Sequence, residues 1–225
     1  MKTNLSGNTM HKNLSATSAS SKFQTARSRR LRVWLPSSIL GLLILGSPVM
    51  AAASTTSTTV SSAISSVISL LSSSGTVNVN VVPTGAGAQT LSSDTVTVST
   101  NDSSGYTLQL AETSAASALT SGGNTIPASA GTQGTPIAMA ANTWGYRVDG
   151  VGGFGAGPTS TQSSAAISGT IKFAAVPATA SPNTLKTTSG TASSDTTTVW
   201  YGVAANTSQP TGTYTNSVTY TVTAN

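Results

Sequence analysis

The strongest constraint on the fold is an alternation of hydroxyl and apolar side chains near the C-terminal end of the chain. Between residues 213 and 224 every odd position is Thr or Ser, and the even positions are apolar or aromatic except for Asn216. Successive side chains of a β-strand point to opposite faces of its sheet. The segment therefore predicts an antiparallel strand with one buried face and one hydroxyl-lined face in water.

The same period of two recurs on both sides of a polar loop in the first half of the chain. Residues 91–100 and residues 106–110 alternate between polar and apolar side chains, and the loop 101–105 between them ends in Gly105. Two strands joined by a short polar loop that ends in glycine predict a β-hairpin. Alternating or β-branched runs predict further strands at 76–82, 143–148, 167–175 and 196–205.

These segments together predict the fold class. Short strands separated by Gly and Pro turns, without helical segments between them, indicate a sandwich or a barrel. Only 7% of the residues are charged, while Ser and Thr make up roughly a third of the chain, which disfavours a helical bundle. We predict an all-β fold, an antiparallel Ig-like or pilin-like β-sandwich over residues 76–225. The chain has no cysteine, so a single large core must stabilise it without disulfides.

The first 53 residues have the features of a secretory signal peptide with a long basic n-region. Seven Lys and Arg residues and no acid precede an apolar run at residues 39–45, and small residues follow. We expect cleavage after Ala51 or Ala53. A retained anchor is the alternative, and the sequence leaves open whether translation starts at Met1 or at Met10. The pair Arg29-Arg30 resembles a twin-arginine export signal, so the export route stays open.

Removing this leader changes the charge of the protein. The remaining chain has three cations and five acids, a net charge of −2, whereas the full chain has +5. A nucleic-acid-binding domain needs clustered Lys and Arg to neutralise phosphates. We therefore expect no nucleic-acid partner, and membrane contact only through an uncleaved leader.

Residues 54–75 are almost entirely Ser, Thr and apolar residues. Apolar residues recur at spacings of four, three, one and three, which is typical of a helical stripe: Val60, Ile64, Val67, Ile68 and Leu71. Ser and Thr are poor helix formers. The segment is therefore either a hydroxyl-rich linker or a short amphipathic helix.

The residues after the leader lack the usual catalytic set. The only histidine is His11, in the leader, so neither a Ser-His-Asp arrangement nor the common zinc ligands can form in the domain. A hydrolase would need two carboxylates, yet Asp94, Asp102 and Asp149 lie in or beside turn-like stretches. Residues 150–155 match G-x-G-x-x-G, but no helix is expected after them. We predict no catalytic residue, no cofactor and no metal.

Aromatic residues are the remaining candidates for a binding site. Trp144, Tyr146, Trp200 and Tyr201 offer ring faces on which a sugar can stack, and they serve equally well as core residues. Val199, Tyr201 and Val203 fall on one face of the expected strand, so Trp200 falls on the other. The alternation predicts that either Trp200 or Tyr201 points away from the core.

The closing segments carry a resemblance to a known group of proteins. Residues 201–203, 210–214 and 218–222 read Tyr-Gly-Val, Pro-Thr-Gly-Thr-Tyr and Val-Thr-Tyr-Thr-Val. This stretch resembles the last two strands of exported bacterial surface β-sandwiches, namely spore coat protein U-like and fimbrial pilin-like domains. A weaker similarity links it to WxL-type surface proteins, although neither Trp144 nor Trp200 stands in a Trp-x-Leu motif. The resemblance implies a surface sandwich, without the disulfide that pilin-like families often carry.

These observations favour a secreted or cell-surface β-sandwich without catalytic activity, in a structural or adhesive role. Two alternatives stay open. One is a carbohydrate- or cell-wall-binding module that uses the aromatics. The other is a fibre subunit assembled by β-strand addition, in which residues 77–82 complete the sheet of a neighbour. The expected partners are cell-wall glycan, other surface proteins or further copies of the chain.

Overall fold

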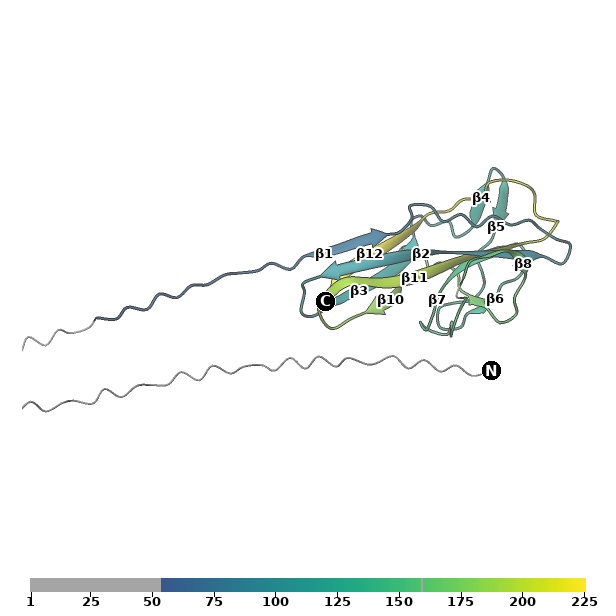
Figure 1. The fold of residues 1–225 in the computed structure, drawn as a ribbon. Coiled ribbons are helices and arrows are strands. Elements are labelled where there is room, and N and C mark those ends of the chain that lie inside the picture. Colours follow the sequence, from purple (N-terminus) through teal and green to yellow (C-terminus); the bar gives the residue numbers. More distant parts are fainter. Residues whose placement is uncertain (1–53, 159) are drawn as a thin grey trace, which may run out of the picture. The chain divides into compact units, whose positions relative to one another are not determined.

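The structure is a computed structural model that describes residues 54–158 and 160–225. The predicted signal peptide, including the cleavage candidates Ala51 and Ala53, lies outside the described residues. All regular secondary structure in these ranges is β-strand, and Thr59–Asn225 form one compact unit (Figure 1). The prediction of an all-β protein is therefore confirmed for the described residues.

The strands form two main antiparallel sheets and two short ribbons. The larger sheet has the order β1-β2-β11-β7, and β8 also pairs with β2; its strands are β1 (Ile68–Ser72), β2 (Ala88–Thr100), β7 (Thr143–Val148), β8 (Gln162–Ala166) and β11 (Ala192–Ala205). The smaller sheet has the order β10-β3-β12; its strands are β3 (Tyr106–Glu112), β10 (Asn183–Thr187) and β12 (Val218–Ala224). The ribbons are β4–β5 (Leu119–Ser121, Asn124–Ile126) and β6–β9 (Ile137–Ala138, Lys172–Phe173).

The main core lies between the two sheets, so the arrangement is β-sandwich-like. Both sheets contribute fully buried side chains to one continuous cluster. The larger sheet supplies Val96, Val98, Trp144, Tyr146, Val148, Val199, Tyr201 and Val203. The smaller sheet supplies Tyr106, Leu108, Leu110 and Leu185. In β12 Val218, Tyr220 and Val222 are half-buried and the threonines are exposed, which confirms the alternation read from the sequence up to the exposed Ala224 at the end of the strand.

The predicted hairpin around the loop 101–105 is wrong. β2 pairs with β1, β8 and β11, whereas β3 pairs with β10 and β12, so the loop crosses from one sheet to the other. The reason is that the apolar faces of β2 and β3 bury each other across the core instead of lying side by side. Gly105 permits the crossing with φ of 87°, because a Cβ there would lie 2.3 Å from the Thr188 carbonyl oxygen.

Residues 54–75, the described part of the chain before residue 76, contain an edge strand and no helix. β1 pairs in register with β2 from Ile68↔Thr100 to Ser72↔Val96, so the domain begins before the predicted boundary at residue 76. The apolar spacing also fits a strand, because Ile68 and Leu70 share the half-buried face. A run of Ser and β-branched residues favours the extended form over the helix.

Residues 77–81, which we call the strap, differ from their prediction in one respect. Val77, Val79 and Val81 are half-buried against the main core, and Asn78 and Asn80 are exposed, as the alternation predicts. The strap nevertheless belongs to no sheet. Packing of the valines fixes which side chains face inward, while no neighbouring strand lies close enough to complete a ladder.

Three other expected strands have mixed outcomes. β7 has the predicted bounds, and β11 contains residues 196–205 and begins earlier, at Ala192. The single strand expected at 167–175 is wrong: β8 ends at Ala166, and β9 covers only Lys172 and Phe173. Gly, Ser and Thr at residues 168–170 interrupt the run, and Ser168 hydrogen-bonds locally to the amides of the next residues.

A second, smaller core covers the outer face of the larger sheet. Its buried members are Leu91, Met139, Phe173, Trp200 and Ala204. Phe173 can pack against the sheet because Gly145 and Gly202 face each other across β7 and β11. A Cβ on Gly202 would come within 2.7 Å of the Phe173 ring. The glycine pair therefore makes room for the β6–β9 ribbon.

This close approach predicts a strong effect of substituting Gly145. A Cβ there would lie 2.5 Å from the Ala174 carbonyl oxygen, a backbone atom that also accepts the Tyr146 amide at 2.9 Å. We expect Gly145→Ala to lower the free energy of unfolding by about 1–3 kcal/mol. Urea unfolding measures this, with Gly190→Ala as the control, since a Cβ at Gly190 meets nothing within 4 Å. Equal stabilities of the two variants would contradict the packing argument.

Candidate functional site

A groove of about 890 Å³ opens beside the strap and is the principal candidate site. The strap forms one wall, and residues 209–218, which lead into β12, form the other. Trp144, Tyr201 and Val203 from the larger sheet lie at its floor, together with Leu119 and Ile126 from the β4–β5 ribbon. The groove is therefore an apolar trough with two extended chain segments as walls.

Asp94 anchors the wall that the strap forms. Its carboxylate is almost fully buried and accepts hydrogen bonds from Ser72 Oγ at 2.7 Å, Ser73 Oγ at 2.8 Å and the Ser74 amide at 3.2 Å. These bonds hold the chain where it leaves β1 and turns toward the strap. Asp94 was expected in or beside a turn-like stretch; it lies inside β2, within the strand that the alternation of residues 91–100 predicts.

The opposite wall is tied down by backbone and side-chain hydrogen bonds. Thr120 and Thr215 exchange amide-to-carbonyl bonds of 3.0 Å in both directions, and the Thr113 amide donates to the Ser217 carbonyl at 2.9 Å. Tyr214 donates its hydroxyl to the Pro210 carbonyl at 2.8 Å. The wall is thus fixed to β4 and to the chain after β3, while its side toward the groove stays open.

The strap has the unusual property of an unpaired backbone. Within the described residues, no amide from Val77 to Val81 donates a hydrogen bond, and the only strap carbonyl that accepts one is that of Asn80, from Thr90 Oγ1 at 2.7 Å. Backbone groups in native proteins are paired with protein or with water. An extended segment with free amides and carbonyls along a groove is a template for another strand.

The four aromatics proposed as a sugar-stacking platform are all buried. The exposed fractions of Trp144, Tyr146, Trp200 and Tyr201 are 4%, 0%, 7% and 6%. Trp200 lies on the opposite face from Tyr201, as the alternation predicts, but it enters the second core instead of pointing into solvent. The structure therefore brings Trp144 and Tyr201 to the groove floor and presents none of the four rings as an open platform.

Polar ends of these aromatics are used for internal hydrogen bonds. Trp144 Nε1 donates to the Ser117 carbonyl at 2.8 Å, and the hydroxyls of Tyr201 and Tyr220 lie 2.8 Å apart, linking β11 to β12. Burial, together with the neighbouring Tyr220, raises the pKa of Tyr201 well above its usual value. Burial also raises the pKa of Tyr146 to about 12. These hydroxyls stay protonated at neutral pH and act as structural donors.

Glu112 is an acid that sequence reasoning did not single out. It is 1% exposed at the end of β3, and neither carboxylate oxygen has a hydrogen-bond partner among the described residues. Burial raises its pKa from 4.5 to about 7. A carboxyl group that is partly protonated at neutral pH, inside the sandwich, destabilises the fold whenever it ionises.

The other charged side chains form pairs that stabilise separate parts of the fold. Arg147 is fully buried, contacts Asp149 at 2.9 Å and donates to the carbonyl of Gly155 at 3.2 Å, which fixes the Gly-rich loop. Lys186 contacts Asp195 at 2.5 Å, and Tyr106 donates its hydroxyl to the same carboxylate at 2.8 Å. Within residues 54–158 and 160–225, no three acidic, His or Cys side chains gather as metal ligands.

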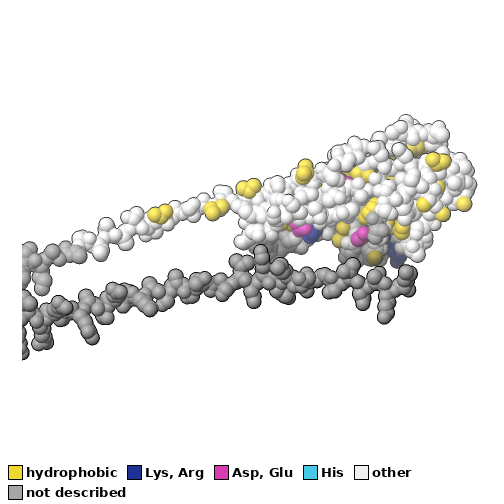
Figure 2. Space-filling view, in the orientation of Figure 1, with side chains coloured by type: hydrophobic (Ala, Val, Ile, Leu, Met, Phe, Trp, Pro, Cys, Tyr) yellow, Lys and Arg dark blue, Asp and Glu magenta, His cyan; other side chains and the backbone are white. Residues whose placement is uncertain are grey.

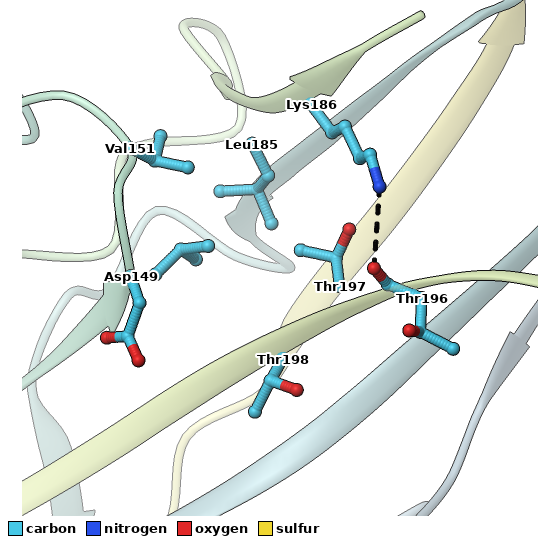
Figure 3. A pocket seen from close by; sticks show the side chains of 8 residues that line it. Asp149, Val151, Leu185, Lys186, Thr196, Thr197 and Thr198 are labelled. Atoms are coloured by element: carbon cyan, nitrogen blue, oxygen red, sulfur yellow. Dashed lines mark hydrogen bonds between the residues drawn. The ribbon is translucent and has the colours of Figure 1, made fainter. Parts of the chain in front are cut away.

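A second, smaller cavity of about 400 Å³ lies between β10 and β11, beyond the end of β7. Figure 3 shows Asp149 and Val151 on one side of it and the side chains of residues 196–198 on the other, with Leu185 and Lys186 above. Lys186 donates to the Thr196 carbonyl at 3.5 Å and also contacts Asp195. Because Asp149 is paired with Arg147, the charges around this cavity are already neutralised.

Comparison with protein-family models, curated proteins and solved structures found no match for the chain. The described ranges contain no helix long and apolar enough to cross a membrane.

The anchoring role of Asp94 leads to a first prediction for the site. Replacing Asp94 by Ala removes three hydrogen bonds, so we expect a loss of about 1–3 kcal/mol in the free energy of unfolding. Hydrogen exchange should speed up in β1 near Ser72 and leave β3 unchanged. Asp102→Ala is the control, because Asp102 binds Ser66 and Ser104 at the other end of β1. Unchanged exchange near Ser72 in Asp94→Ala would refute the role.

Glu112 leads to a prediction about pH. The folded pKa is raised above the unfolded value, so the unfolded chain binds fewer protons between pH 4.5 and about 7, and stability falls as pH rises through that range. We expect the free energy of unfolding to drop on the order of 1–3 kcal/mol over this window. Glu112→Gln, a neutral side chain of the same shape, should abolish the drop. A variant with the same pH profile as the wild type would show that Glu112 is not responsible.

Proposed function

We propose that the chain is an exported, non-catalytic protein of the cell surface with a structural or adhesive role. The proposal is supported mainly by the contacts of the few charged side chains, most of which bind other parts of the fold. Asp94, Asp102, Asp149 and Asp195 each bind a neighbouring part of the fold, and Glu112 is buried alone. No two of these carboxylates converge on a described cavity with a free nucleophile or base beside them.

The finer description of the fold belongs to the same proposal. We assign the domain to the Ig-like or pilin-like β-sandwiches that its closing strands resemble. Two antiparallel sheets with a core between them, and a groove along one side of β12, support the assignment. A surface protein of this kind needs a rigid body with an uncharged, hydroxyl-lined exterior, which the exposed threonines of β12 illustrate.

A second candidate function, a fibre subunit assembled by β-strand addition, is favoured by the strap. An unpaired strand edge along an apolar groove is the surface that a further strand recognises. The alternation of residues 77–82 predicted that this segment is the donor strand. Because Val77, Val79 and Val81 pack on the core of their own domain, we now place the strap on the acceptor side. The carbohydrate-binding alternative has no comparable support, since its aromatics are buried.

Cell fractionation with N-terminal sequencing tests the proposed location. We expect the protein at the surface or in the medium, with a mature terminus after Ala51 or Ala53. A variant with Leu43→Arg, which interrupts the apolar run of the leader, should stay inside the cell at full length. Wild-type protein found only in the cytoplasm with its leader intact would overturn the proposal.

A further inference from the structure

β1 leaves one edge of the larger sheet open. It is the terminal strand of that sheet, and β2 is its only partner among the described strands. The bonds at its two ends show how its backbone is turned. The Asn101 amide donates to the Val67 carbonyl at 3.3 Å at one end. The Ser73 amide donates to the Thr95 carbonyl at 2.8 Å at the other. The odd-numbered residues of this segment therefore direct their backbone groups toward β2.

The even-numbered residues of β1 direct their amides and carbonyls to the open edge. Hydrogen-bonded and non-hydrogen-bonded pairs alternate along an antiparallel ladder. Ile68, Leu70 and Ser72 therefore stand opposite β2 in non-hydrogen-bonded pairs. Within the described ranges, no backbone amide or carbonyl of these three residues has a partner. A row of free backbone groups at the edge of a sheet is a template for another strand.

The outward face of β1 is both apolar and exposed. Val67 and Leu71 are 65% and 69% exposed, and the exposed Ser69 lies between them. Figure 2 shows apolar side chains along the segment that leads into the domain, with no charged side chain among them. Residues 54–73 contain neither a charged residue nor proline, which are the usual means of blocking an open edge. Two apolar side chains on one face of an unblocked edge mark an interaction surface.

The edges formed by β7, β10 and β12 differ from that of β1. β7 is covered at Tyr146, whose backbone exchanges two bonds of 2.9 Å with Ala174. β10 carries Lys186 and has a register shift between Thr184 and Lys186, and both charge and irregularity oppose pairing. β12 exposes threonines on its outward face, so pairing there would bury little apolar surface. β1 therefore combines free backbone groups with apolar side chains that remain exposed.

The backbone of β1 is complementary to a second copy of itself. Antiparallel pairing about a two-fold axis beside Leu70 sets Leu70 opposite Leu70 of the second copy. It also sets Ile68 opposite Ser72 in both directions. All of these residues present a free amide and a free carbonyl to the edge, so each pair can exchange two hydrogen bonds. No like charges meet, because β1 carries no charge.

The same register brings the exposed apolar side chains together. Leu71 stands opposite Ser69 of the second copy in a non-hydrogen-bonded pair, in which side chains lie close to each other. Its diagonal neighbours are Val67 and Leu71 of the second copy, which long side chains can reach. Pairing therefore removes the apolar face of β1 from water in both copies at once.

We propose that two copies of the chain pair through β1, antiparallel and with Leu70 opposite Leu70, so that their larger sheets join into one continuous sheet. Both copies use the same surface, so the contact closes as a two-fold dimer. It differs in this respect from the head-to-tail strand addition considered above. The dimer goes beyond the proposed location and role, and it depends on neither.

Sedimentation of the purified full-length protein, as the cell produces it, tests the dimer. Leu71→Lys removes apolar contact and brings like charges together across the two-fold axis, so it should weaken association by about tenfold or more. The Leu71 side chain is exposed, so the variant is expected to fold. Val82→Lys is the matched control, because Val82 is 71% exposed, lies outside β1 and receives the same charge. Equal weakening in the two variants, or a wild type that stays monomeric up to its limit of solubility, would overturn the inference.

Disulfide trapping tests the register, since the chain has no cysteine of its own. Mixing a Ser69→Cys protein with a Leu71→Cys protein should give a cross-linked heterodimer, because a non-hydrogen-bonded pair brings the two Cα atoms to about 4.5 Å. The Ser69→Cys protein alone is the control, since its two cysteines would lie diagonally, roughly 7–8 Å apart, which is too far for a disulfide. Linkage of the control as fast as that of the mixture would overturn the register. Preferential linkage of Ser69→Cys to Thr219→Cys, on β12, would show that β1 pairs with a different edge.

Discussion

The pairing of β2 with β11 is the interaction on which the rest of the structure depends. The two strands pair over twelve residue positions, from Ala192↔Thr100 to Ala205↔Ala88, and β11 is buried on both faces from Val199 onward. One face builds the core that the smaller sheet closes, and the other supports the β6–β9 ribbon. Buried backbone hydrogen bonds in a low-dielectric environment are strong and costly to break. Loss of this ladder would therefore expose both cores together.

Burying a polar or charged side chain in this core costs free energy unless the group has a hydrogen-bond or ion-pair partner. Arg147, Asp94 and the tyrosine hydroxyls satisfy this requirement by binding loops and neighbouring strands. Among the described residues the exceptions are the Thr197 hydroxyl and the Glu112 carboxyl group, and burial of Glu112 costs stability once it ionises. The two ion pairs, Arg147–Asp149 and Lys186–Asp195, likewise bind parts of the fold to one another and do not line the groove.

How far the sequence predicts this structure depends on the range of the interaction. Period-two patterns located β7, β11 and β12, because the alternation is local. The choice of pairing partner is not local, because the same pattern fits a hairpin or a connection between two sheets. The loop 101–105 was therefore predicted to close a hairpin, whereas it connects the two sheets. For a similar reason the sequence does not decide whether the aromatic residues are buried or exposed. Trp200 is covered by the β6–β9 ribbon, whose residues are distant from it in the sequence. Asp94 was missed as an anchor because its serine partners lie about 20 residues away.

The strap shows why an unpaired strand can persist in a folded monomer. Its inward valines contribute apolar burial that holds the segment in place, while water can solvate its backbone along the open groove. The valines thus fix the spacing of the groove walls without filling the space between them. Natural proteins usually block such an edge with charge or proline. Here the strap carries no charge, and the proline stands only after its end, at Pro83. An edge left open in this way favours occupation by a strand over permanent solvation.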